Sequence, residues 1–216
     1  MAISDPLAIA DFWERLVFMG RPEFQPRHYR KQSIDGADNA RSAAFGRQKW
    51  FVDVTLEGGR HDSNMVQEAD IMRLEGMDQT FLAYDIRKPY PADDLDGWKL
   101  GDTVQHIKSK GSNNRSLALE DLRPNFKVTK TDKISVLYQS TKYFLTEVME
   151  TVTADVNGDT TEFEIWPPMP SGVAVADAVT LIKPPAKFKI IAGSYRPAAA
   201  QGNLSSGISF SMFSVP

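Results

Sequence analysis

The residue types that most often carry enzyme chemistry are few and scattered in this sequence. The three histidines, His28, His61 and His106, lie far apart, and none has a partner at metal-ligand spacing. Cysteine is absent, which excludes disulfides, thiolate metal sites and cysteine nucleophiles. No G-x-S-x-G segment is present to hold a serine nucleophile on a sharp turn. The sequence therefore predicts a protein that is not an enzyme and holds no metal or cofactor.

Two other segments have some features of ligand-binding loops. Gly58-Gly59 precedes a predicted helix, but it lacks the Lys-Ser/Thr pair of a phosphate-binding P-loop. Asp155, Asn157 and Asp159 alternate as calcium ligands do, but the glycine is fourth in the run rather than sixth. Trp166 stands where the twelfth-position glutamate is required. A turn is therefore favoured over a calcium loop.

Charged residues that alternate with apolar ones form two further groups. Glu162 and Glu164 are paired carboxylates of the kind that glycosidases use, but their alternation favours the solvated face of a strand. A basic cluster near the N-terminus has aromatic and apolar residues between its charges: Arg21, Arg27, Arg30 and Lys31. The formal net charge is only -3, from 25 basic and 28 acidic residues, which argues against a general nucleic-acid binder. We interpret the cluster as an exposed or interfacial strand.

In the first half of the chain, periodicity predicts two helices and three strands. The helices are expected over 6–17 and from near Asp62 or Asn64, and the strands over 24–34, 50–56 and 80–84. The strand over 50–56 places Trp50, Val52, Val54 and Leu56 on one face. In the second helix, Asn64 and Gln67 resemble a capping box. The apolar residues of this helix form a stripe at helical spacing, which is predicted to pack on a sheet: Met65, Val66, Ala69 and Met72.

The second half shows short alternating segments almost throughout, at 134–138, 144–148, 161–165, 173–175, 179–181, 188–190 and 208–212. Asn157-Gly158 predicts a type I′ hairpin turn. A connector over 87–102, rich in proline and aspartate, is the predicted domain boundary. No signal peptide and no membrane-spanning run is expected, so we predict a soluble protein made in the cytosol.

Several segments together resemble the distal tail proteins of long-tailed, siphovirus-type phages. In the first half they are Arg47-Gln48-Lys49-Trp50, the strand and helix that follow, and Gln79-Thr80-Phe81-Leu82-Ala83-Tyr84-Asp85. In the second half they are Leu117-Ala118-Leu119, Asp132-Lys133-Ile134-Ser135-Val136, Thr153-Ala154-Asp155-Val156-Asn157-Gly158, Trp166-Pro167-Pro168, and Val179-Thr180-Leu181 before Pro184. The resemblance is greatest to versions from phages and prophages of marine α-proteobacteria.

This resemblance implies a structural virion protein at the tail tip, assembled in the host cytoplasm as a homo-hexameric ring. The ring would join the tail tube protein to the hub and to receptor-binding or side fibres. The implied fold is mainly β with a few short helices. Residues 1–90 plus 186–216 would form a tail-tube-like β-sandwich flanked by a helix, the belt of the ring. Residues 98–185 would form an inserted β-sandwich or barrel on its periphery. No membrane segment and no specific nucleic-acid binding is expected.

A ring role gives the polar segment over 33–47 a use, because a long loop between two strands can reach an adjacent ring or subunit. The predicted interface residues are Arg27, Arg30, Lys31, Asp35, Asp38, Arg41 and Arg47. Two alternatives remain open. One is another tail component, either a tube or a terminator subunit. The other is a carbohydrate-binding β module with sugar-stacking side chains at Trp98, Trp166, Tyr90 and Tyr195.

Overall fold

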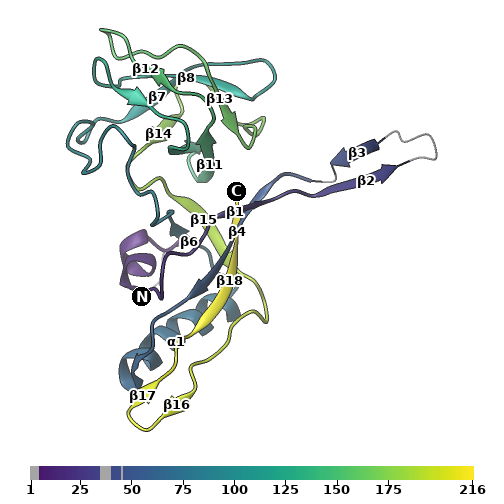
Figure 1. Cartoon of the computed structure of the whole chain (residues 1–216), viewed down its shortest axis with the longest axis vertical. Coiled ribbons are helices and arrows are strands. Elements are labelled where there is room, and N and C mark those ends of the chain that lie inside the picture. The colour runs from purple at the N-terminus through teal and green to yellow at the C-terminus, as the bar shows by residue number, and fades with distance from the viewer. Residues whose placement is uncertain (1–4, 35–39, 45) are drawn as a thin grey trace. The chain divides into compact units, whose positions relative to one another are not determined.

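The computed structural model of the protein describes residues 5–34, 40–44 and 46–216 (Figure 1). The chain forms two compact units, each assembled from separate parts of the sequence. The barrel unit contains the described residues of Met1–Arg15, with Phe81–Lys187 and Pro216. The sheet–helix unit contains Leu16–Thr80 and Phe188–Val215. Strands dominate both units, so the predicted mainly-β fold is confirmed.

The barrel unit begins with two 3-10 turns, η1 (Ile9–Asp11) and η2 (Trp13–Arg15). Its strands are β6 (Phe81–Ala83), β7 (Gln105–Lys110), β8 (Ser116–Glu120), β9 (Lys127–Val128), β10 (Lys133–Tyr138), β11 (Lys142–Val148), β12 (Val152–Thr153), β13 (Phe163–Trp166), β14 (Ala178–Thr180) and the start of β15 (Ala186–Ile190). Six of them close an antiparallel barrel in the order β10-β11-β13-β8-β7-β14. The inserted segment is thus a barrel rather than a sandwich. Residues 173–175, predicted as a strand, form none.

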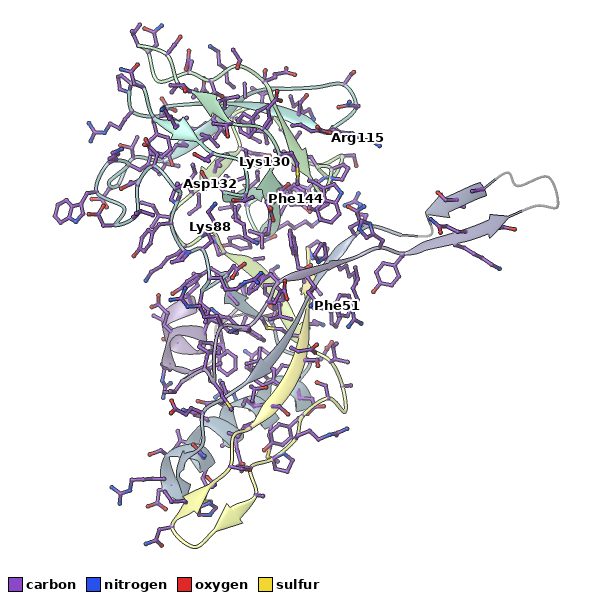
Figure 2. The ribbon with its side chains drawn as sticks, viewed as in Figure 1. Phe51, Lys88, Arg115, Lys130, Asp132 and Phe144 are labelled. Atoms are coloured by element: carbon purple, nitrogen blue, oxygen red, sulfur yellow. The ribbon has the colours of Figure 1, made fainter. Side chains whose placement is uncertain are left out.

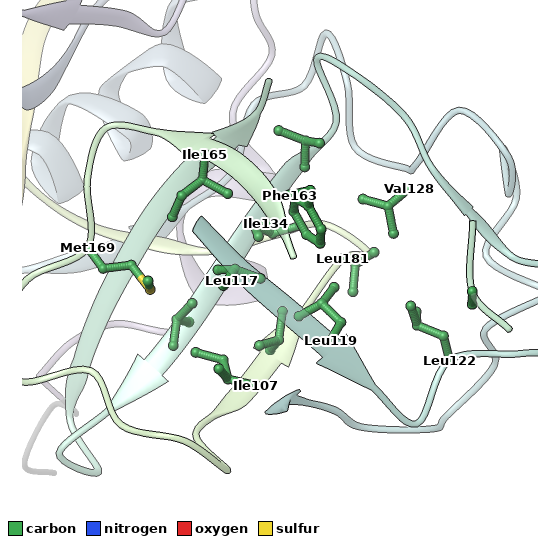
Figure 3. Packing of buried hydrophobic residues seen from close by; sticks show 14 of the residues in the cluster. Ile107, Leu117, Leu119, Leu122, Val128, Ile134, Phe163, Ile165, Met169 and Leu181 are labelled. Carbon is green, nitrogen blue, oxygen red and sulfur yellow. The ribbon is translucent and has the colours of Figure 1, made fainter. Parts of the chain in front are cut away.

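The barrel encloses one hydrophobic cluster, which Figure 3 shows from close by. Alternation accounts for much of it, since Ile134 and Val136 on β10 and Phe163 and Ile165 on β13 point inward. Leu117 and Leu119 on β8 complete the same layer (Figure 3). Closure removes the unpaired edges that an open sheet of this size would leave.

The N-terminal segment packs onto the barrel unit by a buried aromatic anchor. Trp13 is fully buried, and its Nε1 donates a hydrogen bond to the carbonyl oxygen of Tyr84 at 3.0 Å. Phe12 packs edge-on against Phe81. The predicted helix over 6–17 was wrong, because two separate 3-10 turns stand in its place. The same contacts place 5–15 and 81–90 with the barrel, whereas the sequence assigned 1–90 to the other domain.

The turn that follows β12 depends on the carboxylate of Asp155. Its Oδ1 accepts hydrogen bonds from the backbone N–H of Asn157 at 2.8 Å and of Asp159 at 3.0 Å. The donors Asp159 and Asn157 hold the pKa of this carboxyl below its usual value. Gly158 alone in the turn has a positive φ, 87°. The predicted type I′ hairpin was wrong, since β12 pairs with β9 and β13 pairs with β8 and β11.

The sheet–helix unit contains one long helix, α1 (His61–Gly76). Its strands are β1 (Gln25–Arg27), β2 (Arg30–Ile34), β3 (Ala40–Ala44), β4 (Lys49–Thr55), β5 (Gly59–Arg60), the rest of β15, β16 (Ala200–Gln201), β17 (Leu204–Ser205) and β18 (Ser209–Val215). The main sheet has the order β1-β4-β18-β15 in this unit, and β16-β17-β5 form a smaller one. Within the described residues, no helix is long and apolar enough to cross a membrane.

The central pair β4 and β18 confirms the predicted alternation. Trp50, Val52 and Val54 of β4 are buried, and so are Phe210 and Met212 of β18. Antiparallel pairing places Val54 opposite Phe210 and Val52 opposite Met212, so that one face of both strands belongs to the core.

Helix α1 has its exposed and buried faces the other way round from the prediction. Met65, Val66 and Met72, expected to pack on the sheet, are 53%, 55% and 58% exposed. Ile71 and Leu74 are buried instead. The predicted capping box was also wrong, because the N-cap is Arg60 and no side chain caps the helix.

A buried amide explains this orientation. Asn64, predicted to cap the helix, is buried within its first turns, and its Nδ2 donates to Ser205 Oγ at 2.6 Å. On the same side, Glu68 and Glu75 accept backbone hydrogen bonds from Ala198 and Gly193 of the segment between β15 and β18. Partners more than 100 residues away therefore decide which face of α1 is buried.

The predicted strand over 24–34 divides into β1 and β2, and much of the predicted loop over 33–47 is strand. β2 pairs with β3 from Arg30 opposite Ala44 to Ile34 opposite Ala40. At the base, β1 pairs with β4 from Arg27 opposite Lys49 to Gln25 opposite Phe51. Figure 1 shows β2 and β3 extending away from the main sheet of their unit. We call this pair the β2–β3 ribbon.

Replacing Gly158 with alanine is expected to lower the free energy of unfolding by at least about 2 kcal/mol, because a Cβ combines left-handed strain with a backbone clash. The added Cβ would lie 2.1 Å from the carbonyl oxygen of Leu122. Urea denaturation measures the loss. Gly101→Ala is the matched control, since Gly101 has a φ of 57° and open space around it. Equal losses in the two variants would contradict the prediction.

Replacing Ile71 with alanine is expected to cost about 2–5 kcal/mol, because it opens a cavity beneath α1. Met72→Ala, on the exposed face of the same helix, is expected to change stability by less than about 0.5 kcal/mol. Denaturant titration of both variants measures the difference. A larger loss for Met72→Ala would reverse the assignment of the two faces.

Candidate functional site

The three histidines lie in separate parts of the structure. His28 Nδ1 lies 3.0 Å from Gln48 Nε2 at the base of the ribbon. His106 Nδ1 lies 2.8 Å from Asp121 Oδ2 on the exposed side of the barrel, and His61 begins α1. No group of three or more His, Cys, Asp or Glu side chains arranged to hold a metal ion occurs among the described residues.

The glycine pair and the aspartate turn have structural roles. A Cβ on Gly58 would lie 2.8 Å from the carbonyl oxygen of Ser205, so this glycine permits a close approach of two backbone segments. In the turn, both ligand-like aspartates are engaged. Asp155 accepts backbone hydrogen bonds, and Asp159 Oδ2 pairs with Lys108 Nζ at 2.6 Å.

The two glutamates on the barrel have different surroundings. Glu162 accepts hydrogen bonds from the hydroxyls of Ser109 and Ser116, at 2.9 and 3.0 Å. Glu164 lies on β13 with its side chain exposed. Hydroxyl-bound and solvated carboxylates of this kind fit the predicted outer face of a strand.

Among the four predicted sugar-stacking aromatics, Trp98 stands apart because it is 83% exposed. The backbone around it is held by Asp94, whose carboxylate accepts from the N–H groups of Lys99 and Leu100. Trp166 and Tyr90 are half-buried in the same unit. Tyr195 belongs to the sheet–helix unit.

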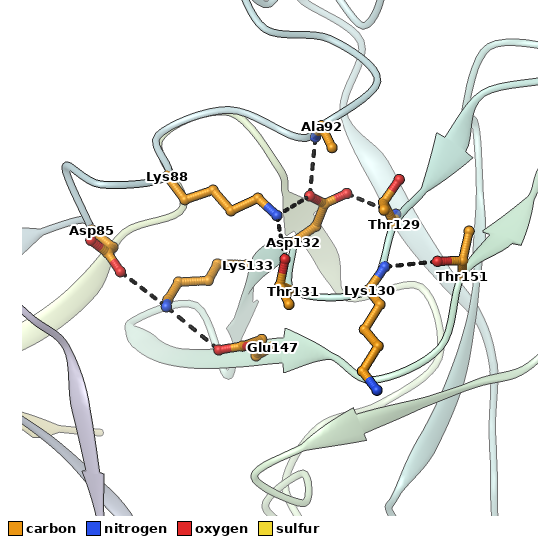
Figure 4. Close-up of polar contacts among 10 residues, drawn as sticks. All are labelled: Asp85, Lys88, Ala92, Thr129, Lys130, Thr131, Asp132, Lys133, Glu147 and Thr151. Carbon is orange, nitrogen blue, oxygen red and sulfur yellow. Dashed lines mark hydrogen bonds and ion pairs between the residues drawn. The ribbon is translucent and has the colours of Figure 1, made fainter.

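The densest polar cluster lies where the connector meets the barrel (Figures 2 and 4). Asp132 is fully buried and accepts hydrogen bonds from the backbone N–H of Ala92 at 3.0 Å and of Thr129 at 2.8 Å. Lys88 Nζ pairs with the same carboxylate at 2.9 Å. Nothing in the local sequence indicates that Asp132 is buried, because aspartate side chains are usually exposed.

Beside it, the buried carboxylate of Asp85 pairs with Lys133 Nζ at 3.0 Å, and Glu147 lies 3.6 Å from the same ammonium (Figure 4). Lys133 is the first residue of β10, so this ion pair ties the connector to a barrel strand. All charges in the cluster have partners of the opposite sign or N–H donors. These contacts give the cluster a structural role, since they hold the Asp85 and Asp132 carboxylates in place.

The predicted interface residues map onto the ribbon and its base. Arg27, Lys31 and Arg47 are exposed, on β1, on β2 and just before β4. Arg30 on β2 lies opposite Ala44, and Arg41 on β3 lies opposite Ser33. Asp35 and Asp38 lie outside the described residues.

Both faces of the ribbon meet solvent. Lys31, Gln32 and Ser33 follow one another on β2 and are all exposed, as are Ser42 and Ala43 on β3. Since successive residues of a strand point to opposite faces, both faces of the ribbon are exposed at these positions. An isolated two-stranded hairpin is marginally stable in water, so this ribbon is a candidate docking element.

At its base, the ribbon is braced by cations stacked on rings. Arg27 Cζ lies 4.2 Å from the centre of the Phe51 ring, and Lys49 Nζ lies 4.7 Å from that of Phe213. The two rings stack with their centres 5.9 Å apart. These contacts stiffen the point where the ribbon leaves the sheet. The ribbon is the candidate functional site.

Replacing Lys133 with methionine is expected to destabilise the protein by up to about 3–5 kcal/mol, because the buried Asp85 carboxylate loses its nearer cation and keeps only Arg87, whose Nε lies 3.6 Å away. Chemical denaturation measures this loss. Lys130→Met is the matched control, since this lysine side chain is exposed and the change is expected to cost less than about 0.5 kcal/mol.

Asp85→Asn combined with Lys133→Met is expected to recover part of the loss, because no bare charge then remains buried. A double variant as unstable as the sum of the two single variants would contradict the pairing.

No family model matches the chain, and no curated protein matches it. The similarity to distal tail proteins therefore stays a prediction, and the exposed ribbon is the feature from which a function has to be argued.

Proposed function

We propose that this protein is a structural subunit that assembles through its β2–β3 ribbon into a ring at the distal end of a long-tailed phage tail. The observation that carries the proposal is the exposure of both faces of the ribbon. Each ribbon strand has five residues and is about 16 Å long at about 3.3 Å per residue. A projection of that length with no covering layer gains stability when a neighbour buries it.

Closed ring symmetry supplies such a neighbour. In a head-to-tail ring, every subunit donates one surface and receives another, so each ribbon finds the same partner. Unpaired strand edges are also covered in this arrangement, which limits uncontrolled aggregation. The resemblance to distal tail proteins favours six subunits in the ring. It also favours the tail tube on one side and the hub and fibre proteins on the other.

The barrel unit favours a distal tail protein over a tube or terminator subunit. A minimal tube subunit needs only a sheet with its flanking helix, whereas this chain adds a closed six-stranded barrel with its own core. A compact extra domain on each subunit suits a protein that presents sites to fibres. The proposal includes no enzymatic activity, cofactor or membrane segment.

Shortening the ribbon tests this function. Replacing residues 31–43 with Asn-Gly joins the paired residues Arg30 and Ala44 through a two-residue hairpin turn. The purified wild-type protein is expected to form rings with about six times the mass of the 24.1-kDa chain. The shortened variant is expected to stay monomeric. Its far-UV circular dichroism spectrum is expected to differ from that of the wild type only by the strand signal of the deleted residues. Mass photometry and negative-stain microscopy measure both.

Val156→Lys on the barrel unit is the matched control, because Val156 is exposed and lies outside the ribbon. It is expected to form rings like the wild type. A wild-type protein that stays monomeric over the whole concentration range would overturn the proposal.

A carbohydrate-binding module is the second candidate, since the exposed ring of Trp98 is rigidly presented. It would be favoured if the monomeric protein bound to a glycan array and Trp98→Ala abolished that binding.

A further inference from the structure

The exposed side of α1 is unusually apolar for a helix in contact with water. Met65, Ala69 and Met72 follow one another at spacings of four and three residues, so they form one stripe, with Val66 beside it. All four are exposed. We call these four residues the α1 stripe. Helix surfaces of soluble proteins normally carry polar residues, and a contiguous exposed apolar patch marks an interaction site.

Methionine suits such a site because its unbranched side chain adapts to the surface that it meets. The stripe is also firmly placed. The opposite side of the helix is anchored by the buried Ile71 and Leu74 and by the hydrogen bond from Asn64 to Ser205. The protein thus holds the stripe outward on a rigid element, which lowers the entropic cost of docking.

The charges of the ribbon and the helix are opposite. The ribbon strands β2 and β3 carry three basic residues and no acidic one. Residues 25–51, which include the base of the ribbon, contain six basic side chains and two acidic ones, in a chain whose net charge is -3. Helix α1 contains four acidic residues and a single arginine, Arg73. Glu68 and Glu75 bind backbone N–H groups of their own chain, whereas Asp62 and Asp70 lie beside the stripe. A basic ribbon and an acidic, methionine-rich helix are complementary.

We propose that the β2–β3 ribbon of one copy of this chain docks on the α1 stripe of the next copy, with its basic residues beside Asp62 and Asp70. The inference rests on the proposed ring and names the surfaces that would form it. Figure 1 shows the ribbon running away from the helix of its own unit, so the helix that it meets belongs to another copy.

The dimensions of the two surfaces agree. Helix α1 has 16 residues and is about 24 Å long at about 1.5 Å per residue, which accommodates a ribbon of about 16 Å. Because the two surfaces differ, the contact is heterologous, and its repetition closes a ring when the rotation allows. The stripe supplies buried apolar area, and the charges fix the register of the ribbon on the helix.

The test uses two full-length variants and their combination. The helix variant, Met65→Lys with Met72→Lys, places positive charge where the basic ribbon docks. The ribbon variant, Lys31→Glu with Arg47→Glu, reverses one exposed charge on β2 and one at the base of the ribbon. All four positions are exposed, and lysine is a good helix former, so both proteins are expected to fold. Val156→Lys in the other unit is the matched control.

Each variant alone is expected to associate at least tenfold more weakly than the wild type in sedimentation velocity and mass photometry. Their equimolar mixture is expected to regain rings of alternating subunits, because each wild-type ribbon then meets a wild-type stripe and each reversed ribbon meets a reversed stripe. A single chain that carries both sets of changes is expected to regain rings, since the charges are then opposite again. Raising salt from about 0.05 M to about 0.5 M is expected to weaken the wild-type rings, as exposed charges are screened.

The outcomes separate the inference from the proposed function. Wild-type rings together with rings of both variants would overturn the docking of ribbon on stripe and leave the ring intact. Loss of rings in both variants without their recovery in the mixture would also overturn it, because the two surfaces would then not meet each other. A monomeric wild type would remove the ring itself.

Discussion

Two buried carboxylates fix the course of the chain where it enters the barrel. Asp85 and Asp132 have almost no contact with water, and a carboxylate so placed is strongly destabilising unless cations and N–H groups surround it. Lys133 from β10 pairs with the first, while Lys88 and the Ala92 N–H from the connector bind the second. Because donors and acceptors lie on both connector and barrel, the connector cannot separate without leaving bare charge in an apolar setting.

The sheet–helix unit, by contrast, has surface elements whose side chains lack cover from the rest of the unit at the described positions. In the barrel unit the chain satisfies its own charges and closes its own sheet. The β2–β3 ribbon leaves both faces in water, and α1 turns its methionines outward. Rigid, internally satisfied parts hold their shape, and surfaces that remain unsatisfied in one chain are the places where a second chain gains most by binding.

Much of the fold could be predicted from local alternation. The period of two in Trp50, Val52 and Val54 identified β4 and its buried face, and the same pattern identified β18. Prediction failed where a long-range partner decides the outcome. Asn64 is a good helix cap by residue type, yet Ser205, 141 positions away, receives its hydrogen bond and makes it a buried residue. No local pattern contains that information.

The reversal of α1 shows why an exposed apolar surface is harder to predict than the fold. Periodicity identifies an apolar stripe but does not say whether a sheet of the same chain or another molecule covers it. Met65 and Met72 were predicted to lie in the core because most such residues do. In the structure, the hydrogen bonds of Asn64 and Glu68 hold the opposite face of the helix against its own unit. An apolar stripe displaced from the core by satisfied polar groups is a stronger sign of an interface than an exposed residue alone. The same polar contacts that hold α1 in place also keep its methionines exposed to solvent.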